Sequence, residues 1–202
     1  RRRRGASDAE PAAAGPGRLT SAQRRARILE AARAEFARVG FQGASTSRIA
    51  ELAGCSEPMV YKHFAGKRDL FVSALRDSIT TFQASFDSAL DPTRSSDVRA
   101  QALAFVDDQV EDLHVRQLMR LRMLAVSISE DDDVRLTLTT LDVATQARIA
   151  SFVERGIAQG AFAPDTDPQQ VAWTWLGLML AACYREALEP GTFATTAPYL
   201  RR

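Results

Sequence analysis

Residues 45–67 read STSRIAELAGCSEPMVYKHFAGK, and their apolar spacing and turn residues predict two short helices joined by a tight turn. Thr46 can act as the N-cap of the first helix, because its hydroxyl can accept a hydrogen bond from a free backbone N–H. Gly54 stands where the end of a helix favours a residue that tolerates positive φ. Ser56 can cap the second helix, whose first turn tolerates Pro58 because its missing N–H would have no partner there. The pattern predicts a helix-turn-helix whose second helix is suited to DNA.

Apolar residues on both sides of this stretch predict longer helices that supply it with a core. Before it, Ile28, Ala32 and Phe36 recur every four residues in a helix expected over residues 21–39. After it, a long helix is expected, and its buried side is marked by Leu70, Phe71, Leu75, Ile79, Phe82 and Phe86. The first three helices therefore have enough apolar surface for a small core of their own.

The rest of the chain predicts four more helices and no convincing strand. Asp97 can cap the first of them, and the acidic run at residues 130–133 suits the start of the third, because acids complement the helix dipole. The last helix opens at Pro168 and is apolar on nearly every face over residues 171–183, so it must be buried on more than one side. We expect these helices over residues 97–115, 116–129, 133–159 and 168–188. The predicted fold class is all-α.

A gapless pattern over about residues 21–75 carries a family resemblance. Its members are Ile28-Leu29-Glu30-Ala31-Ala32, Phe36, Gly40-Phe41, Thr46-Ser47, Ile49-Ala50, Ala53-Gly54-Cys55-Ser56, Val60-Tyr61-Lys62-His63-Phe64 and Lys67-Arg68-Asp69-Leu70-Phe71. With these residues the chain resembles the TetR family of bacterial transcriptional regulators (TetR/AcrR-like). The resemblance implies an N-terminal three-helix helix-turn-helix DNA-binding domain over residues 18–66. It also implies a larger helical ligand-binding and dimerisation domain over residues 67–202, where the match is limited to length and helical pattern.

Charge divides the chain in a similar way. The net charge is +1, but residues 1–70 hold 14 Lys and Arg against 7 Asp and Glu, whereas the remainder holds 12 against 18. This asymmetry suggests a basic part that faces nucleic acid and a separate acidic body. Residues 1–17 lack periodicity, so we expect a disordered basic tail. The run Arg1–Arg4 could follow phosphates, although a solvated tail without a fixed role is the simpler alternative.

The resemblance also implies which side chains meet DNA. Those expected at or near base edges are Ser47, Glu57, Pro58, Met59 and Lys62. Those expected to hold the phosphate backbone are Thr46, Ser56, Tyr61, His63 and Lys67. The chemistry is suitable, because an ammonium can donate to guanine, a carboxylate can accept from cytosine and a methionine can touch a thymine methyl. Three of these residues have structural alternatives: core packing for Tyr61, a structural hydrogen bond for His63 and simple solvation for Lys67.

The C-terminal helices are the candidates for dimerisation and for ligand binding. The resemblance implies a homodimer, and the apolar helices over residues 133–159 and 168–188 are the candidates for its interface. A dimer would bind a near-palindromic double-stranded DNA operator. We expect a repressor that an apolar small-molecule effector releases from this operator, with activation or corepression as the alternatives. The candidate pocket residues are large or adaptable side chains, for which ordinary core packing is the alternative: Phe105, Met119, Met123, Trp173, Met179 and Tyr184.

Few residues suggest catalysis. His63 and His114 are the only histidines, and Cys55 and Cys183 have no metal or redox spacing. The acids before His114 could bracket a cation, but they are typical of the solvated face of a helix. No run of 18 apolar residues and no signal peptide is present. The sequence therefore predicts a cytoplasmic DNA-binding regulator that is not an enzyme, with no catalytic residue, metal, cofactor or membrane partner. The alternative is an architectural DNA binder without ligand control.

Overall fold

The computed structural model describes residues 19–93, 95, 97–189, 191–192 and 195, which form eight α-helices and no strand. The expected basic tail over residues 1–17, with the run Arg1–Arg4, lies outside the described residues. The helices are α1 (Ser21–Gly43), α2 (Thr46–Leu52), α3 (Glu57–His63), α4 (Lys67–Ala89), α5 (Val98–Glu111), α6 (Leu113–Val126), α7 (Asp132–Ala158) and α8 (Pro168–Leu188). The all-α prediction is confirmed for the part of the chain that the structure describes.

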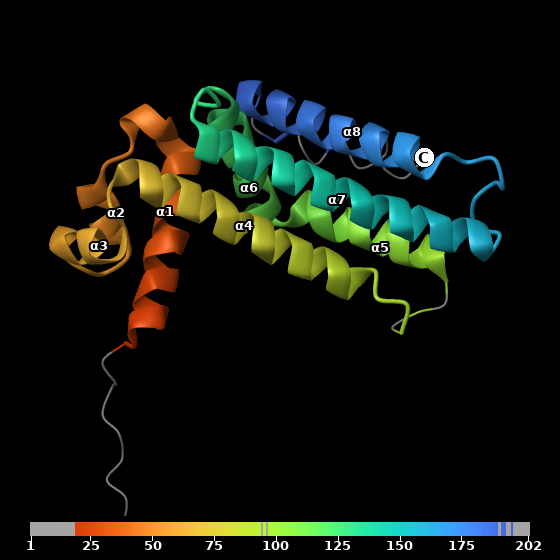
Figure 1. Cartoon of the computed structure of the whole chain (residues 1–202), viewed down its shortest axis with the longest axis horizontal. Helices are drawn as coiled ribbons and strands as arrows, with labels where there is room; N and C mark the ends of the chain where they lie inside the picture. Colours follow the sequence, from red (N-terminus) through yellow and green to blue (C-terminus); the bar gives the residue numbers. More distant parts are fainter. Residues whose placement is uncertain (1–18, 94, 96, 190, 193–194, 196–202) are drawn as a thin grey trace, which may run out of the picture.

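The helices form a small N-terminal unit and an elongated helical body (Figure 1). Helices α1, α2 and α3 lie together at one end, and α4 leaves this end and runs into the body. Helices α7 and α8 pack side by side along the outer edge of the body, while α5 and α6 lie beneath them. Because α4 belongs to both parts, it is the direct covalent and structural connection between them.

An aromatic cluster holds the N-terminal unit against α4. The ring of Phe71 meets the rings of Phe36 and Phe41 edge to face, at centroid distances of 5.1 and 5.3 Å. Phe36 and Phe71 are fully buried. Helical geometry in α1 breaks at Gly40, where φ is 77°, a value that side chains with a Cβ rarely adopt. This break lies at the predicted helix end and brings Phe41 back onto the cluster.

Several predicted helix boundaries are confirmed by capping contacts. Asp97 accepts a hydrogen bond from the backbone N–H of Ala100 and caps α5, as expected. Pro168 opens α8, and Gly54 has a φ of 65° in the turn after α2. Aspartate is the N-cap of each of the last four helices, at Asp97, Asp112, Asp131 and Asp167.

Two local predictions were wrong. The N-cap of α2 is Ser45, which accepts from the backbone N–H of Arg48, whereas Thr46 is the first helical residue. The hydroxyl of Thr46 instead contacts α3, as described below. The helix expected over residues 97–115 ends at Glu111, because Asp112 adopts an extended conformation and caps α6. An aspartate side chain that satisfies a free N–H outweighs the continuing apolar pattern at this point.

Polar contacts fasten the N-terminal unit to the body at two places. The Arg33 side chain of α1 donates to Gln117 of α6 at 3.1 Å. Arg68, near the start of α4, makes ion pairs with Asp131 and Asp133 at the start of α7. One continuous cluster of buried apolar side chains also extends from α1 to α8. A movement inside the body can therefore reach the helix-turn-helix through packed elements.

Among the described helices, none is both long and apolar enough to cross a membrane.

Candidate DNA-binding surface and ligand pocket

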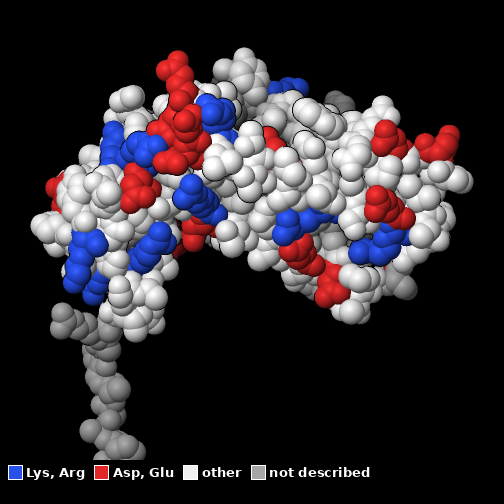
Figure 2. Space-filling model, viewed as in Figure 1, with Lys and Arg blue, Asp and Glu red and all other residues white. Residues whose placement is uncertain are grey.

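Helices α2 and α3 present polar side chains at the free end of the molecule. Ser47, Pro58 and Lys62 are exposed there, whereas Glu57 and Met59 are half-buried. Lys62 makes no hydrogen bond or ion pair with another described residue, so its ammonium is available to a ligand. Figure 2 shows several Lys and Arg side chains over this end of the molecule. The five residues expected at base edges thus belong to one short two-helix unit.

A hydrogen-bonded triad fixes the relative position of α2 and α3. The Thr46 hydroxyl donates to Glu57 Oε1, and the Tyr61 hydroxyl lies 3.1 Å from the Thr46 oxygen. Because the single proton of Thr46 is directed to the carboxylate, Tyr61 is the donor in the second bond. Thr46 is buried, while the Tyr61 side chain remains 52% exposed. The triad holds α3 at a set angle to α2. Because the Tyr61 side chain is half exposed, Tyr61 is not a core residue, which excludes the core-packing alternative.

Lys67 has protein partners that the sequence does not reveal, whereas His63 contacts only the ring next to it in the chain among the described residues. The Lys67 ammonium donates to the backbone carbonyl of Gln42 at 3.1 Å and lies 5.0 Å from the centre of the Phe41 ring. The half-buried His63 ring lies 6.4 Å from the ring of Phe64. Lys67 is therefore an anchored cation at the start of α4 rather than a freely solvated one. Ser56, the remaining expected backbone contact, is exposed at the N-cap of α3.

The outer faces of α7 and α8 carry exposed apolar side chains. On α8, Trp173, Leu180 and Tyr184 follow one another at helical spacing, and Trp173 is 67% exposed. On α7, Leu136 and Val143 are exposed seven residues apart. The two helices lie side by side (Figure 1), so the exposed apolar residues stand on neighbouring helices. Apolar faces of this kind mark sites of protein association.

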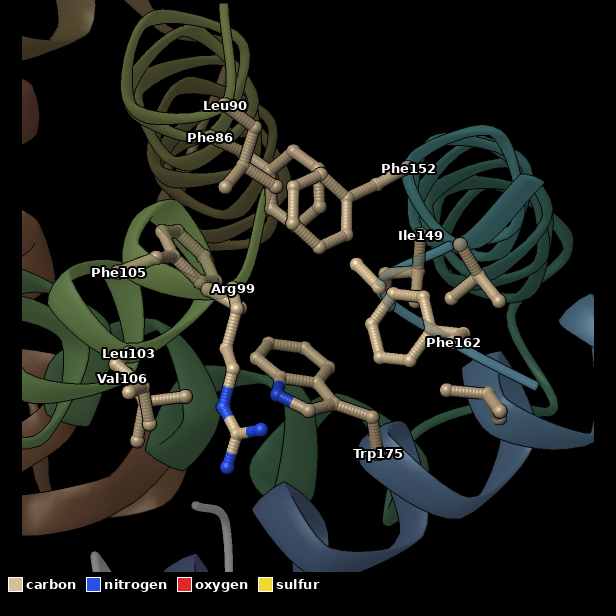
Figure 3. A pocket seen from close by; sticks show the side chains of 14 residues that line it. Phe86, Leu90, Arg99, Leu103, Phe105, Val106, Ile149, Phe152, Phe162 and Trp175 are labelled. Carbon is tan, nitrogen blue, oxygen red and sulfur yellow. The ribbon is translucent and has the colours of Figure 1, made fainter. Parts of the chain in front are cut away.

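A cavity of about 470 Å³ opens between α4, α5, α7 and α8. Aromatic rings and Leu, Ile, Val and Ala side chains make up nearly all of its wall, and Arg99 is its one charged lining residue among those described. Figure 3 shows the rings facing one another across the space from different helices and the loop before α8. The aromatic lining residues are Phe86, Phe105, Phe152, Phe162 and Trp175. This volume lies within the range of pockets that hold small molecules.

A glycine on α7 allows one wall of the cavity to form. The Phe162 ring rests directly on Gly156, where an added Cβ would lie 2.2 Å from a ring carbon. The backbone carbonyl of Gly156 also accepts from the N–H of Ala161 at 2.8 Å, which turns the chain back after α7. A side chain at residue 156 would displace Phe162 and change the shape of the pocket.

Of the six residues that the sequence suggested for the pocket, one lines the cavity and five do not. Phe105 lines the cavity. Met119 and Met179 are buried in the core away from its wall, and Met123 is half-buried and also does not line it. Trp173 and Tyr184 point outward on the exposed face of α8. The neighbouring Trp175 lines the pocket instead, with its ring 6.0 Å from that of Phe105.

Ion pairs and burial shift several pKa values. Hydrogen bonds from Arg68 lower the pKa of Asp131 to about 2, and the same contacts raise the pKa of Arg68. In the body, burial lowers the pKa of Arg122 and raises that of its partner Asp142, because desolvation disfavours both charges. Burial also raises the pKa of the Cys183 thiol to about 12. Cys183 is therefore an unreactive core thiol, and no disulfide joins it to Cys55.

Comparison with known families gives two matches along the chain. The family described as "Bacterial regulatory proteins, tetR family" matches residues 28–74, from α1 into α4. The family described as "Tetracyclin repressor-like, C-terminal domain" matches residues 125–195, which include α7 and α8. Together the two matches span more than half of the chain, and they fall on the two parts that the fold distinguishes.

Individual relatives show the same similarity. The transcriptional activator FasR of Mycolicibacterium smegmatis is 33% identical over 45% of this chain, and the match spans 42% of FasR. The transcriptional repressor KstR2 of Mycobacterium tuberculosis is 28% identical over 71% of this chain and 72% of its own length. A protein from Saccharomonospora viridis, solved in complex with choline, superposes with a TM-score of 0.76 at 22% identity. That superposition covers 89% of this chain and 94% of the other.

Proposed function

Because the chain belongs to the TetR family of bacterial transcriptional regulators, we propose that α3 reads operator DNA and that the body cavity controls this binding. The protein is a DNA-binding regulator. The observation that carries the proposal is the arrangement around α4, which joins the polar helix-turn-helix at Lys67 to the wall of the cavity at Phe86.

The DNA contacts divide into two groups by their surroundings. Lys62 and Ser47 are exposed and unconstrained, which suits hydrogen bonds to base edges in the major groove. Tyr61 and Lys67 are held by neighbouring groups, which suits fixed contacts to phosphates. Glu57 is already bonded to Thr46, so we assign it mainly to orienting α3 and secondarily to a cytosine contact. Pro58, Met59, Ser56 and His63 complete the proposed surface.

The apolar face of α7 and α8 is the proposed dimer interface. A second copy would cover Trp173 and its neighbours and form a four-helix arrangement with a two-fold axis. Two recognition helices related by this axis would read half-sites about 34–36 Å apart, which corresponds to one turn of DNA. We also propose the domain division at residues 66 and 67, because α4 starts at Lys67 and runs from the helix-turn-helix into the body.

The cavity supports control by a small molecule, with α4 as the element that transmits it. This helix has 23 residues and spans about 34 Å, and its far end supplies Phe86 to the cavity wall. A ligand that pushes on this end would tilt the helix-turn-helix and disturb the spacing of the two heads. We propose release from the operator, as in a repressor. The choline of the Saccharomonospora viridis protein is not carried over, because 22% identity relates the two chains by fold alone.

A purely architectural role is less well supported, because an apolar cavity in the body has no use in it. Catalysis also lacks support: His63 and His114 lie on different helices, and no described group of three His, Cys, Asp or Glu gathers as a metal site would require.

The experiment is selection of bound fragments from random DNA, followed by titration of the selected sequence at two salt concentrations. We expect a near-palindrome bound by one dimer or a pair of dimers, with strong salt dependence from phosphate contacts. Lys62→Ala provides the control and should select a site with weaker preference at one base step. A failure to enrich any sequence with the wild-type protein would contradict the proposal.

A further inference from the structure

We propose that the cavity takes a monoanionic carboxylate with an apolar body, and that Arg99 binds its carboxylate. The inference rests on the proposed function, because it names the class of ligand for the same cavity. It follows from the charge, the unpaired state of Arg99 and the size of the space.

The wall of the cavity combines one charge with an otherwise apolar surface. Phe86, Phe105 and Trp175 provide ring faces and edges for a ligand body, with Phe86 and Phe105 already in edge-to-face contact at 4.8 Å. No Asp or Glu is among the described lining residues. Arg99 itself is exposed, so its charge stands at the solvent side of this apolar wall. Such a wall favours a ligand that is mostly apolar and carries one charge of opposite sign.

Arg99 is positioned and free to bind this charge. It lies in the first turn of α5, and Figure 3 shows its guanidinium extending along the edge of the cavity toward Trp175. Among the described residues, Arg99 has no ion pair or hydrogen bond. Arg148, an arginine of α7, is by contrast engaged with Asp87 at 2.8 Å. A planar guanidinium without a partner matches the two oxygens of a carboxylate.

A second guanidinium lies behind the same wall. Arg155 donates to the Leu90 carbonyl at 2.7 Å and to the Gln101 side chain at 3.2 Å. It also lies 5.1 Å from the centre of the Phe152 ring, and both Leu90 and Phe152 line the cavity. These partners are uncharged, so they do not neutralise the guanidinium. Arg155 therefore adds a second positive charge close to the cavity wall.

A cationic ligand is the main alternative, because aromatic rings can form a cage around an ammonium group. Here the rings stand beside Arg99, which would repel a cation, and no carboxylate among the described lining residues would offset the repulsion. Arg99 is the one charged side chain among the described lining residues, and its guanidinium can pair with one carboxylate, which favours a monoanion over a dianion. The size is consistent with this class, since about 150 Å³ is enough for benzene and 470 Å³ is roughly three times that space. Two fused rings or a medium-length acyl chain would fit as the body.

The test is calorimetric titration of the DNA-free protein with 2-naphthaleneacetate, its neutral amide and the cationic 2-(2-naphthyl)ethylamine. Decanoate and decanamide form a second pair with an acyl body. We expect at least one acid to bind about fivefold or more tightly than its amide, and the amine to bind most weakly. This preference should shrink at about 1 M salt, where the Debye length is about 3 Å.

Two variants assign the preference to a residue. Arg99→Gln should bind the acid and the amide equally, whereas Arg99→Lys should retain part of the difference. Arg135→Gln is the matched control, because Arg135 is an exposed arginine of α7 that pairs with Asp132 outside the cavity. It should keep the full preference for the acid. Equal binding of acid and amide by the wild-type protein, tighter binding of the amine, or no binding of either acid would overturn the inference.

Operator binding separates this inference from the proposed function. If an acid binds through Arg99 but leaves operator affinity unchanged, the ligand class stands and the proposed control fails. If the acids do not bind and a neutral compound releases the operator, the ligand class is overturned and the proposed control stands.

Discussion

The two ends of α4 meet surroundings of opposite character. At Lys67, hydrogen bonds and packed rings hold two short helices in one arrangement, with Phe71 fully buried and Thr46 bonded to Glu57. At Phe86, five aromatic side chains from separate elements surround a space that they do not fill. The elements around the Lys67 end of α4 are tightly packed in one arrangement. The cavity at the Phe86 end leaves room for a ligand to change the packing.

This difference gives the two regions different tasks. A surface that reads base edges needs its side chains in place before DNA arrives, because ordering them on binding would reduce affinity. A regulatory pocket needs at least two arrangements of similar free energy, so that a ligand can shift their populations. The contrast between a packed end and an open end of one helix therefore leads to predictions that can fail separately.

The largest expected effect concerns stability. Phe71→Ala should lower the free energy of unfolding by about 3–5 kcal/mol, because it removes a fully buried ring from the cluster with Phe36 and Phe41. Phe162→Ala removes the same atoms from a half-buried ring at the cavity and should lower it by about 1–2 kcal/mol. Urea denaturation measures both. Equal losses would show that the two ends are packed alike.

Trp173→Asp should weaken the dimer by about 2–4 kcal/mol, since it places a charge on the apolar face of α8. Sedimentation over a concentration series would show monomers where the wild-type protein is dimeric. Trp175→Leu is the control from the same helix, because Trp175 faces the cavity rather than the outer face. A dimer of unchanged affinity in Trp173→Asp would place the interface elsewhere.

Two lysine substitutions test which residues of the DNA-binding surface contact bases and which contact phosphates. Lys62→Ala should reduce affinity by about 1–3 kcal/mol for operators with the preferred base at one step, and little for operators that lack it. Lys67→Ala should weaken binding to all sequences alike and reduce the salt slope by about one unit. Titrations of an operator series at several salt concentrations distinguish the two. A uniform loss in Lys62→Ala would assign Lys62 to the phosphates.

The smallest effect is expected at the contact between α4 and α7. Arg68 lowers the pKa of Asp131 from 3.8 to about 2, so this contact stabilises the fold above pH 4. The contribution is lost as the pH falls from about 4 through 2, because the unfolded chain binds the proton first. Arg68→Gln should return the pKa of Asp131 toward 3.8 and flatten this part of the stability profile. Carboxyl titration by NMR measures the change, and an unaltered pKa would exclude the ion pair in solution.

The sequence predicted the helix-turn-helix well because its signals are local. Gly54, Ser56 and Pro58 act on the backbone within a turn of their own positions, and the structure places each at the expected position, although the Ser56 side chain makes no capping hydrogen bond. The error at Thr46 has a different origin. Its hydroxyl bonds to Glu57 and Tyr61, which are 11 and 15 residues away, and so Ser45 serves as the cap. Contacts between helices are not visible in a local pattern.

The pocket was poorly predictable for a related reason. Trp173 and Trp175 are two residues apart, so they point about 200° apart around α8, one to solvent and one to the cavity. A helix that is apolar on every face gives no polar stripe from which to assign these directions. The sequence also gives no signal that distinguishes buried core residues, such as Met119 and Met179, from residues that line a cavity. Arg99 has no sequence signal, since its role depends on the three other helices around the cavity.

The central claim is that the cavity and the DNA-binding surface are coupled through α4. The most direct measurement is the operator affinity of Ala102→Phe, which would place a ring in the cavity without any ligand. Ala104→Phe is the control, because Ala104 is exposed on the same helix and does not line this cavity. We predict that Ala102→Phe binds the operator about 5–150-fold more weakly than the wild-type protein, while Ala104→Phe binds normally. Unchanged affinity in a folded Ala102→Phe protein would contradict the coupling, and tighter binding would contradict release as its direction.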